Sequence, residues 1–236
     1  MIAVPRKRFW TSAVVAEEED GFAVRLDARA LTTPARAPLR VPTRPLAEGI
    51  AAEWNDVEGE IRPERMPLTR AANTSIDGVV PNSRPLAEAI ASYGGTDLLC
   101  YRAEDPEGLR LRQFRAWDPL LAWASEVLGA RLIAVMGVMH APQPEESLAA
   151  LRQAVDEEGP FRLTGLSELV SLSGSLVLGL AVSRGVLEAS TAWRISRIDE
   201  DWQEEQWGVD AEARAAAEAR REAFLAAERY LRLLER

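Results

Sequence analysis

The residues best suited to binding or catalysis lie in the stretch Ser196–Gly208, which reads SRIDEDWQEEQWG. Because a helix turns by about 100° per residue, one of its sides would carry apolar residues that face a core; they are Ile195, Ile198 and Trp202. The opposite side mixes indole rings with carboxylates, and its members are Trp193, Glu200, Glu204 and Trp207, with Asp199 at the border. Tryptophan is enriched at protein interfaces. We therefore predict that these last five residues bind a partner protein.

Two other interpretations of this stretch stay open. The first is a solvated acidic face in which the tryptophans are incidental. The second is a pair of carboxylates for acid–base catalysis, which needs a cleft and a positioned partner group. A continuous helix offers little of either, so the pattern favours binding over catalysis.

A second group of polar and aromatic residues lies between positions 53 and 77. Glu53 and Trp54 end a predicted helix, where the indole either locks a domain junction or meets a partner. Thr69, Asn73 and Asp77 follow one another at intervals of four, so a helix would align them for hydrogen bonds to neighbouring chain. The segment has no glycine-rich anion nest and no cluster of bases. It therefore predicts no reaction.

The scarcity of cysteine, histidine and lysine excludes several kinds of site. The one cysteine, Cys100, cannot form an internal disulfide, and the one histidine, His140, cannot build a histidine-rich metal site. His140 follows an apolar run and is interpreted as a strand-end residue. No Gly-Lys-Ser or Gly-Lys-Thr tripeptide occurs, which excludes a P-loop. We expect no metal and no cofactor.

The charge balance argues against nucleic acid and membrane surfaces. The chain has 236 residues, 47% of them hydrophobic, and a formal charge of −9, so it should fold and should repel phosphate backbones and anionic lipid. The longest largely apolar stretch, Leu169 to Ser183, is shorter than the roughly 20 residues of a bilayer span. The start of the chain lacks the apolar region of a signal peptide. We expect a cytoplasmic protein with no membrane insertion.

The first 42 residues read as a β-rich domain. Phe9–Val15 and Phe22–Asp27 have strand composition with a polar turn between them, and Leu39–Val41 is bounded by prolines, as at a sheet edge. This small antiparallel unit would be marginal alone. We expect it to lean on the rest of the chain.

From residue 43 to residue 236 the pattern becomes mostly helical, so the expected class is α+β. The similar hexapeptides Thr43–Glu48 and Ser83–Glu88 combine a hydroxyl cap, an early proline and an acid, as at helix starts. Further helices are predicted at 68–80, 106–128, 144–158, 189–207 and 210–234. The segment 97–102 reads as a short buried strand or extended piece, and 131–140 as a strand, with or without a helical turn before it.

Small side chains recur in the segment Leu166–Val186. Ser171, Ser175, Gly179 and Ser183 are spaced by four, so a single helix would align them in one stripe that lets a second helix approach closely. The segment is apolar nearly all round. It predicts a central buried helix of the second domain and not a ligand site.

Five motifs, taken in order, resemble those of the assembly chaperones that hold the α subunit of the F-type ATP synthase. They are Glu53-Trp54; Met66 to Thr69 with Asn73-Thr74 and Asp77; Thr96 to Arg102; Gln113 with Trp117-Asp118-Pro119; and Ser196 to Gly208. The motif residues include Pro67, Asp97, Tyr101, Arg102, Trp117 and Trp202. The similarity runs from about Arg8 to about Asp210. The final helix carries no signature of this family.

The resemblance implies a non-enzymatic, ATP-independent chaperone with a small β-rich domain and a mostly helical one. Such proteins bind the unassembled α subunit and release it as the ring of α and β subunits forms. In this family, positions that match Trp54 and Asp199, with Glu200 beside it, matter for function. We expect Asp199→Lys or Glu200→Lys to leave folding intact and to weaken capture of the α subunit.

Two other functions stay open beside this one. They are an adaptor for a different protein and, less favoured, a small carboxylate-based hydrolase. Nothing in the sequence demands more than a monomer.

Overall fold

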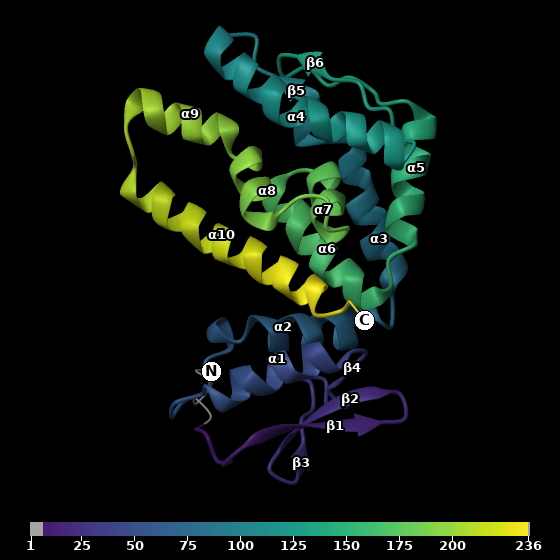
Figure 1. The fold of residues 1–236 in the computed structure, drawn as a ribbon, viewed down its shortest axis with the longest axis vertical. Coiled ribbons are helices and arrows are strands. Elements are labelled where there is room, and N and C mark those ends of the chain that lie inside the picture. The colour runs from purple at the N-terminus through teal and green to yellow at the C-terminus, as the bar shows by residue number, and fades with distance from the viewer. Residues whose placement is uncertain (1–6, 236) are drawn as a thin grey trace. The chain divides into compact units, whose positions relative to one another are not determined.

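The computed structural model describes residues 7–235. The first six of the 42 residues predicted to form a β-rich domain lie outside this range. Two compact units emerge from the contacts within the chain. The first contains residues up to Ser83, together with Pro160–Gly165 and the chain from Arg229 onward, and the second contains Arg84–Gly159 and Leu166–Glu228. The helices and strands of both are labelled in Figure 1.

The first unit is built on a small antiparallel sheet. Strand β2 (Gly21–Leu26) pairs with β1 (Ala13–Glu18), β3 (Arg29–Ala30) and β4 (Arg40–Val41), with Val15 opposite Val24. Gly21 lies at the tight turn after β1 with φ +132°, and a Cβ there would lie 2.6 Å from the Val41 carbonyl oxygen. The expected strand at Phe9–Val15 starts later, at Ala13, because the indole of Trp10 turns into the core.

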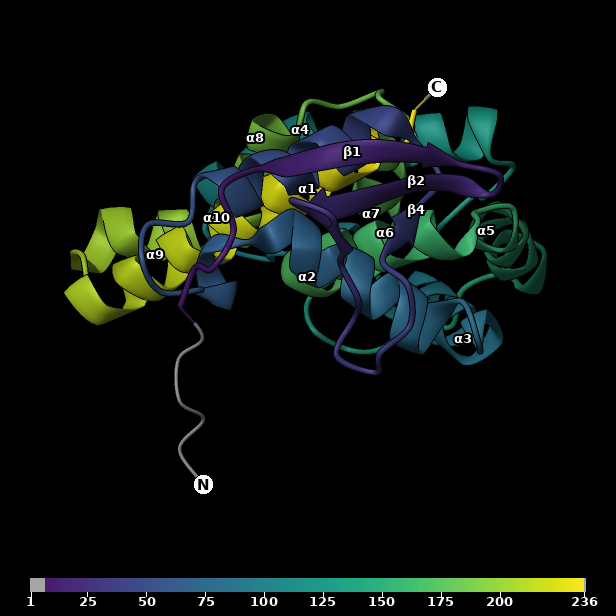
Figure 2. The ribbon, with the colours of Figure 1, turned by 90° about the horizontal axis from the view of Figure 1, so that it is seen from below.

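Helices α1 (Arg44–Asn55) and α2 (Pro67–Thr74) complete the first unit. Helix α1 packs against β1 and β2 (Figure 2), and its buried Leu46 and Ile50 share one core with Val24 and with Leu68 of α2. A 3₁₀ turn, η1 (Pro63–Arg65), precedes α2, and a π-helical turn, η2 (Ser75–Val79), continues it. The helix predicted over 68–80 therefore exists, with a widened final turn.

The boundary of the first unit does not lie at residues 42 and 43, where the sequence predicts a change from strands to helices. The first unit extends to Ser83. Helices α1 and α2 belong with the sheet because α1 covers it, α2 packs on α1, and all three share one apolar core. The hydroxyl of Thr43 caps no helix; it donates a hydrogen bond of 2.5 Å to the carbonyl of Leu233. The C-terminal turn of the chain is thereby attached to the first unit.

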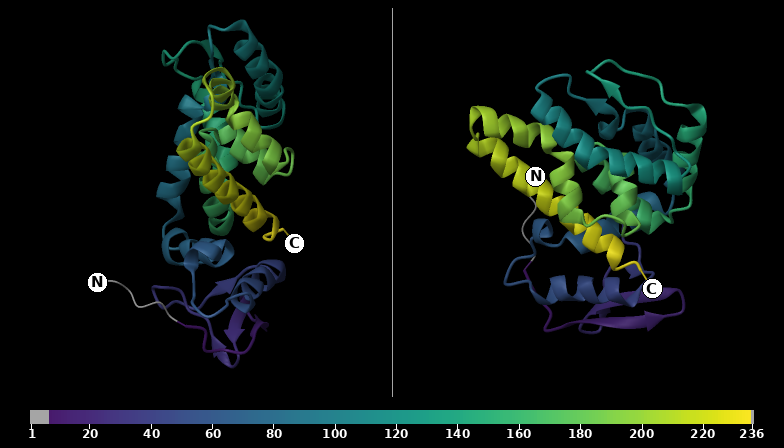
Figure 3. Two further views of the ribbon diagram at one scale, coloured as in Figure 1. Left: turned by 90° about the vertical axis from the view of Figure 1, so that its left-hand side faces the viewer. Right: turned by 45° about the horizontal axis from the view of Figure 1, so that its top comes forward.

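The second unit is almost entirely helical. Its helices are α3 (Ser83–Ser92, whose first residue belongs to the first unit), α4 (Glu107–Val127), α5 (Glu145–Asp156), most of α6 (Pro160–Ser173), α7 (Leu176–Ser183), α8 (Ala189–Ser196), α9 (Ile198–Trp207) and α10 (Ala211–Arg232) as far as Glu228. Short 3₁₀ turns, η3 (Tyr93–Thr96) and η4 (Leu98–Cys100), lead into the two-residue strand β5 (Tyr101–Arg102), which pairs in parallel with β6 (Val135–Met136). The right-hand view of Figure 3 shows α9 and α10 joined by one short loop.

The predicted single helix through Leu166–Val186 is wrong. Helix α6 ends at Gly174 in the left-handed region (φ +71°), and Ser175 caps the separate helix α7 by accepting a hydrogen bond from the Leu178 N–H. The four small residues therefore form no continuous stripe. Gly179 still allows close packing, because a Cβ there would meet Val170 of α6 at 2.6 Å.

The remaining fold expectations are mostly confirmed. The chain is α+β, and the helices predicted at 106–128, 144–158 and 210–234 match α4, α5 and α10. The short buried segment at 97–102 contains η4 and β5, whereas only two residues of 131–140 form a strand. Among residues 7–235, no helix is both long enough and apolar enough to cross a membrane.

Candidate functional site

The predicted docking stretch is divided between two helices. The continuous helix expected over 189–207 is wrong, because Arg197 (φ −109°, ψ 15°) leaves the helical region and separates α8 from α9. The break sends the two predicted tryptophans in different directions. Trp193 is buried and its ring lies 5.7 Å from that of Phe224, whereas Trp207 is 79% exposed. The expectation that Trp193 shares an exposed face with Trp207 is therefore wrong.

One side of α9 is fastened to α4. Arg112 donates two hydrogen bonds of 2.7 Å to the Glu205 carboxylate, and its guanidinium lies 4.6 Å from the centre of the Trp202 ring. Trp202 also packs on Gly108, where a Cβ would meet its ring at 2.7 Å. These contacts explain why Trp202 is half-buried, and they fix α9 on α4 in the second unit.

Asp199 lies on this fastened side. The Nε2 group of Gln113 donates a 2.6 Å hydrogen bond to its carboxylate, and the Oε1 atom of Gln113 accepts one of 2.8 Å from the Ala103 N–H. The side chain of Asp199 is thus tied to α4 through Gln113. Sequence reasoning missed this tether, although Gln113 belongs to one of the five motifs.

Arg197 gathers the other carboxylates of α9. Its side chain, 14% exposed, lies 3.6 Å from Asp201, 3.7 Å from Glu204 and 3.9 Å from Glu200. Glu204 is also paired with Arg214 of α10 at 3.4 Å, so it is an internal ion-pair residue. Glu200, with half of its side chain exposed, has only the longest of these contacts. Of the acids predicted to face a partner, Glu200 is the most available.

The electrostatics of α9 combine a favourable helix start with local pairing. Its first turn carries three carboxylates, Asp199, Glu200 and Asp201. The positive end of the helix dipole stabilises negative charge at this position. Burial raises the pKa of Asp201 above its ordinary value, and Arg197 opposes this shift. The hydrogen bond from Arg112 lowers the pKa of Glu205, and the same contact raises the pKa of Arg112.

A groove of about 500 Å³ lies between α9 and α10. Trp207 stands at its edge, and three small residues of α10 line it, namely Ala213, Ala216 and Ala217. The first six residues of α10 are exposed, so its N-terminal part is little covered in this structure. The groove, the exposed indole of Trp207 and the carboxylate of Glu200 together form the candidate binding site, which we call the α9–α10 groove.

Glu53 has a structural role in the first unit. Its carboxylate accepts hydrogen bonds from the N–H groups of Leu68 (2.7 Å) and Thr69 (2.8 Å) and from the Thr69 hydroxyl (2.7 Å). These groups begin α2, where Pro67 has no N–H to offer. Burial raises the pKa of Glu53 above its ordinary value, and the hydrogen bonds from Thr69 partly oppose this.

Trp54 lies half-buried beside Glu53. Its ring meets that of Trp10 edge-on at 5.1 Å, and its backbone carbonyl accepts a hydrogen bond of 3.2 Å from the Trp10 indole. Within residues 7–235, the indole N–H of Trp54 has no hydrogen-bond partner. Trp54 therefore contributes to the core of the first unit, and a contact with a partner protein stays a prediction.

Two of the three residues in the predicted polar stripe, Thr69, Asn73 and Asp77, form hydrogen bonds to neighbouring chain. Thr69 contacts Glu53 as described, and Asp77 accepts a hydrogen bond of 3.1 Å from the Ala35 N–H, in the loop after β3. In the part of the chain that the structure describes, the Oδ1 atoms of Asn73 and Asp77 have no hydrogen-bond partner. Two of the three residues thus support neighbouring chain, as their spacing indicated.

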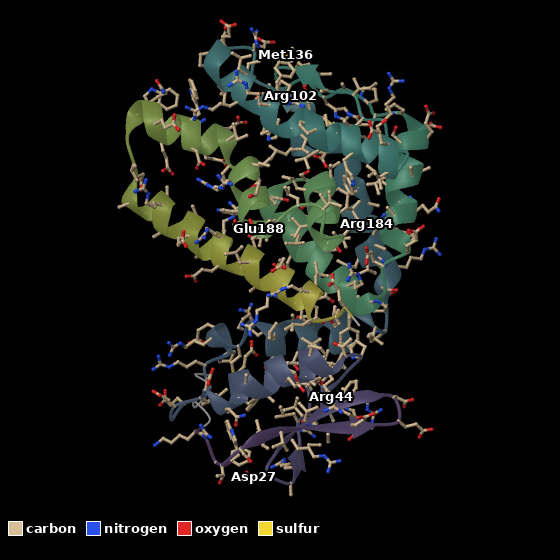
Figure 4. All side chains as sticks on the ribbon, viewed as in Figure 1. Asp27, Arg44, Arg102, Met136, Arg184 and Glu188 are labelled. Carbon is tan, nitrogen blue, oxygen red and sulfur yellow. The ribbon has the colours of Figure 1, made fainter. Side chains whose placement is uncertain are left out.

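The motif around residues 97–118 holds the second unit together. Asp97 is fully buried and accepts hydrogen bonds of 3.0 Å from the N–H groups of Leu99 and Val177. Arg102, also buried, has its guanidinium 5.2 Å from the ring centre of Phe114 and 5.0 Å from that of Trp117. It donates to Asp118 at 2.7 Å, and Figure 4 shows it beside α4.

Two further aromatic residues of these motifs make polar contacts. The Trp117 indole donates a 3.0 Å hydrogen bond to the carbonyl of Ile195. The hydroxyl of Tyr101 and Nδ1 of His140 lie 3.2 Å apart. His140 is exposed and lies beyond the end of β6, so its interpretation as a strand-end residue is wrong.

The comparisons with known proteins identify the family. The family model described as ATP12 chaperone protein matches residues 7–125, about half of the chain. This chain belongs to the ATP12 chaperone family. The resemblance indicated by the five motifs, to the assembly chaperones of F-type ATP synthase, is thereby confirmed.

Solved structures of bacterial proteins agree closely with this fold. Atp12 from Paracoccus denitrificans is 48% identical, with 97% of this chain and 98% of that chain covered and a TM-score of 0.94. A mutant of the same protein, in which an aspartate is replaced by lysine, matches with 47% identity, the same coverage and the same TM-score. A putative chaperone from Agrobacterium tumefaciens is 42% identical over 97% of this chain and 86% of its own, with a TM-score of 0.93.

A eukaryotic member of the ATP12 family is also similar. The mitochondrial protein atp12 of Schizosaccharomyces pombe is 23% identical over 214 residues, which cover 86% of this chain and 74% of the yeast protein. The family therefore includes bacterial and mitochondrial proteins.

Proposed function

We propose that this chain binds the unassembled α subunit of the F-type ATP synthase, shields its subunit interface and releases it when the ring of α and β subunits forms. Membership of the ATP12 chaperone family supports this function. A free α subunit exposes apolar and charged surface that the β subunit later covers, and such surface aggregates. A chaperone that covers it has to release it when β competes.

The exposure of Trp207 at the C-terminal end of the acidic helix α9 is the observation that carries the proposal. An indole that is 79% exposed offers a large apolar anchor. Glu200 offers a carboxylate for an arginine or lysine of the partner, and charge pairing of this kind speeds encounter more than it tightens the complex. An interface of this composition suits temporary binding.

The same proposal covers the other expected properties. The chain acts without catalysis, cofactor or nucleic acid, as a cytoplasmic monomer that does not insert into the membrane. Its similarity to chaperones of the bacteria Paracoccus denitrificans and Agrobacterium tumefaciens supports a bacterial setting. An adaptor for another protein and a hydrolase are the alternatives, and neither has a specific feature of the site in its favour.

Affinity capture with charge-reversal variants tests the proposal. Wild-type chain, Glu200→Lys and the control Glu126→Lys are each co-expressed with the α subunit. Glu126 is an exposed residue near the end of α4, so its reversal changes the net charge by the same amount away from the groove. We expect wild type and Glu126→Lys to recover α equally and Glu200→Lys to recover several-fold less. Equal recovery by all three would remove Glu200 from the interface, and no recovery by wild type would overturn the function.

A further inference from the structure

The two helices that form the α9–α10 groove differ: α9 is held in place by contacts with α4, whereas the N-terminal part of α10 is exposed. Helix α9 is held on α4 by the bidentate Arg112–Glu205 pair, the Gln113–Asp199 hydrogen bond and the packing of Trp202 on Gly108. The opposite wall is the N-terminal part of α10, whose first six residues are exposed. Arg214 of this part contacts Glu204 of α9 at 3.4 Å. An occupant therefore meets a preformed face on α9 and an uncovered one on α10.

The shape of the groove suits a helix. The alanines at 213, 216 and 217 project only methyl groups, so the backbone of α10 is accessible to a bulky apolar side chain or to a closely packed helix. The ring of Trp207 forms the rim next to them. A groove between two helices with an apolar floor is the usual receptor for the apolar face of an amphipathic helix.

The charges that line the groove indicate which polar residues the bound amphipathic helix carries beside its apolar face. Three carboxylates, Glu200, Glu204 and Asp210, line it against two guanidinium groups. Glu204 is held by Arg197 and Arg214. Asp210 accepts hydrogen bonds from the N–H groups of Glu212 and Ala213 in the first turn of α10. Within residues 7–235, Glu200 has one ion-pair contact, with Arg197 at 3.9 Å. A cation of the occupant can therefore pair with Glu200 and also lie over the Trp207 ring.

We propose that the α9–α10 groove binds an amphipathic helix of the unassembled α subunit that carries an arginine or lysine next to its apolar residues. This proposal rests on the proposed function and adds the place and the chemistry of the contact. The apolar side chains of the helix lie on the alanine floor and against Trp207, and its cation pairs with Glu200.

Filling the groove tests the proposal with a matched control. Ala216→Trp places an indole in the groove, whereas Ala215→Trp places one on an exposed side of the same helix outside it. Affinity for purified α subunit is measured for both variants by titration, with circular dichroism as the check of folding. We expect Ala216→Trp to weaken binding at least tenfold and Ala215→Trp to change it less than twofold. If Ala216→Trp fails to fold, Ala216→Asp and Ala215→Asp provide the same comparison.

The possible results distinguish a failure of the groove proposal from a failure of the proposed function. Unchanged binding by the position-216 variant, with wild type still binding α, overturns the groove and leaves the proposed function standing. Absence of binding by wild type overturns both. A concentration-dependent dimer of wild-type chain that Ala216→Trp abolishes would place a second copy in the groove and overturn the α-subunit helix as its occupant.

A crosslinker identifies the segment that occupies the groove. A photoreactive side chain is placed at position 216, with position 215 as the control, and the crosslinked α peptides are mapped. The proposal predicts an amphipathic helical peptide with an arginine or lysine from position 216 alone. Crosslinks to an acidic peptide, or equal crosslinking from both positions, would contradict it.

Discussion

The amide of Gln113 donates a hydrogen bond of 2.6 Å to the carboxylate of Asp199. This bond ties the start of α9 to the middle of α4, and it separates two acids that are adjacent in the sequence. Asp199 faces the fastened side of α9, whereas half of the Glu200 side chain is exposed. Reversing these two charges should therefore have different effects, contrary to the sequence-based expectation that treated them alike.

Asp199→Lys is expected to destabilise the second unit. The substitution leaves the Gln113 amide without its acceptor, so we expect a loss of roughly 1–2 kcal/mol. Asp199→Asn keeps an acceptor oxygen and should lose less than half as much. Glu200→Lys should change the free energy of unfolding by less than about 0.5 kcal/mol. Urea unfolding checks all three, and an Asp199→Lys variant as stable as wild type would show that the hydrogen bond contributes nothing.

Tyr230→Phe should destabilise the first unit. The Tyr230 hydroxyl lies 2.7 Å from the Ser75 hydroxyl, which donates to Thr164 at 2.8 Å, and Thr164 donates in turn to the Pro160 carbonyl. Loss of the tyrosine oxygen breaks this buried chain at a cost of about 1–2 kcal/mol. A double-mutant cycle with Ser75→Ala measures the coupling between the two hydroxyls. Strictly additive effects would mean that they do not interact.

Glu53 should make the stability of the first unit depend on pH. Its pKa is raised by burial, so the folded state favours the protonated form. As the pH rises, the unfolded chain loses this proton first, near pH 4.3, and the folded chain loses it later. The contribution of Glu53 is therefore largest at low pH and falls as the pH passes through the raised value.

Comparison with Glu53→Gln measures this dependence, because glutamine does not titrate. We expect the stability of wild type relative to Glu53→Gln to be smaller at pH 7 than at pH 4 in urea unfolding. A difference that grows with pH would mean that the fold favours the carboxylate, contrary to a raised pKa.

Cys100 should resist thiol reagents in the folded protein. It is buried, and burial, together with the nearby Asp97, raises the pKa of its thiol to about 12. At pH 8 only about 10⁻⁴ of the thiol would be ionised, against roughly a quarter for a cysteine of ordinary pKa. Iodoacetamide should label the chain in urea and leave it unlabelled without urea. Rapid labelling of native protein would show that the 3₁₀ turn at 98–100 opens readily.

Local sequence signals predicted most of the helices and the sheet. The strong periodicity at 106–128 and the prolines near the starts of α1 and α3 gave reliable positions, because these features act within one or two turns. The stop at Gly174 was also visible locally: a Ser-Gly-Ser sequence combines a left-handed C-cap residue with a following N-cap. Periodicity over the whole apolar segment obscured that signal.

The break at Arg197 depends on packing between distant segments. Trp193 is buried against Phe224 of α10, and α9 is held on α4 by Arg112 and Gln113. A helical wheel drawn through 189–207 assumes one axis and therefore assigns Trp193 and Trp207 to one face. The sequence pattern predicted the stretch that contains the candidate site. Within this stretch, the exposure of Glu200 and Trp207 in the structure makes them the candidates for partner contact.

Competition between this chain and the β subunit for the α subunit decides whether the chain holds α temporarily and yields it during ring assembly. The complex of wild-type chain with α is purified, β subunit is titrated in, and the α that stays bound to the chain is measured by size-exclusion chromatography. We expect a complex of this chain with α when β is absent, and a progressive transfer of α into species that contain both α and β as β is added. Failure of α to bind in the absence of β, or binding to α that β does not relieve, would contradict this expectation.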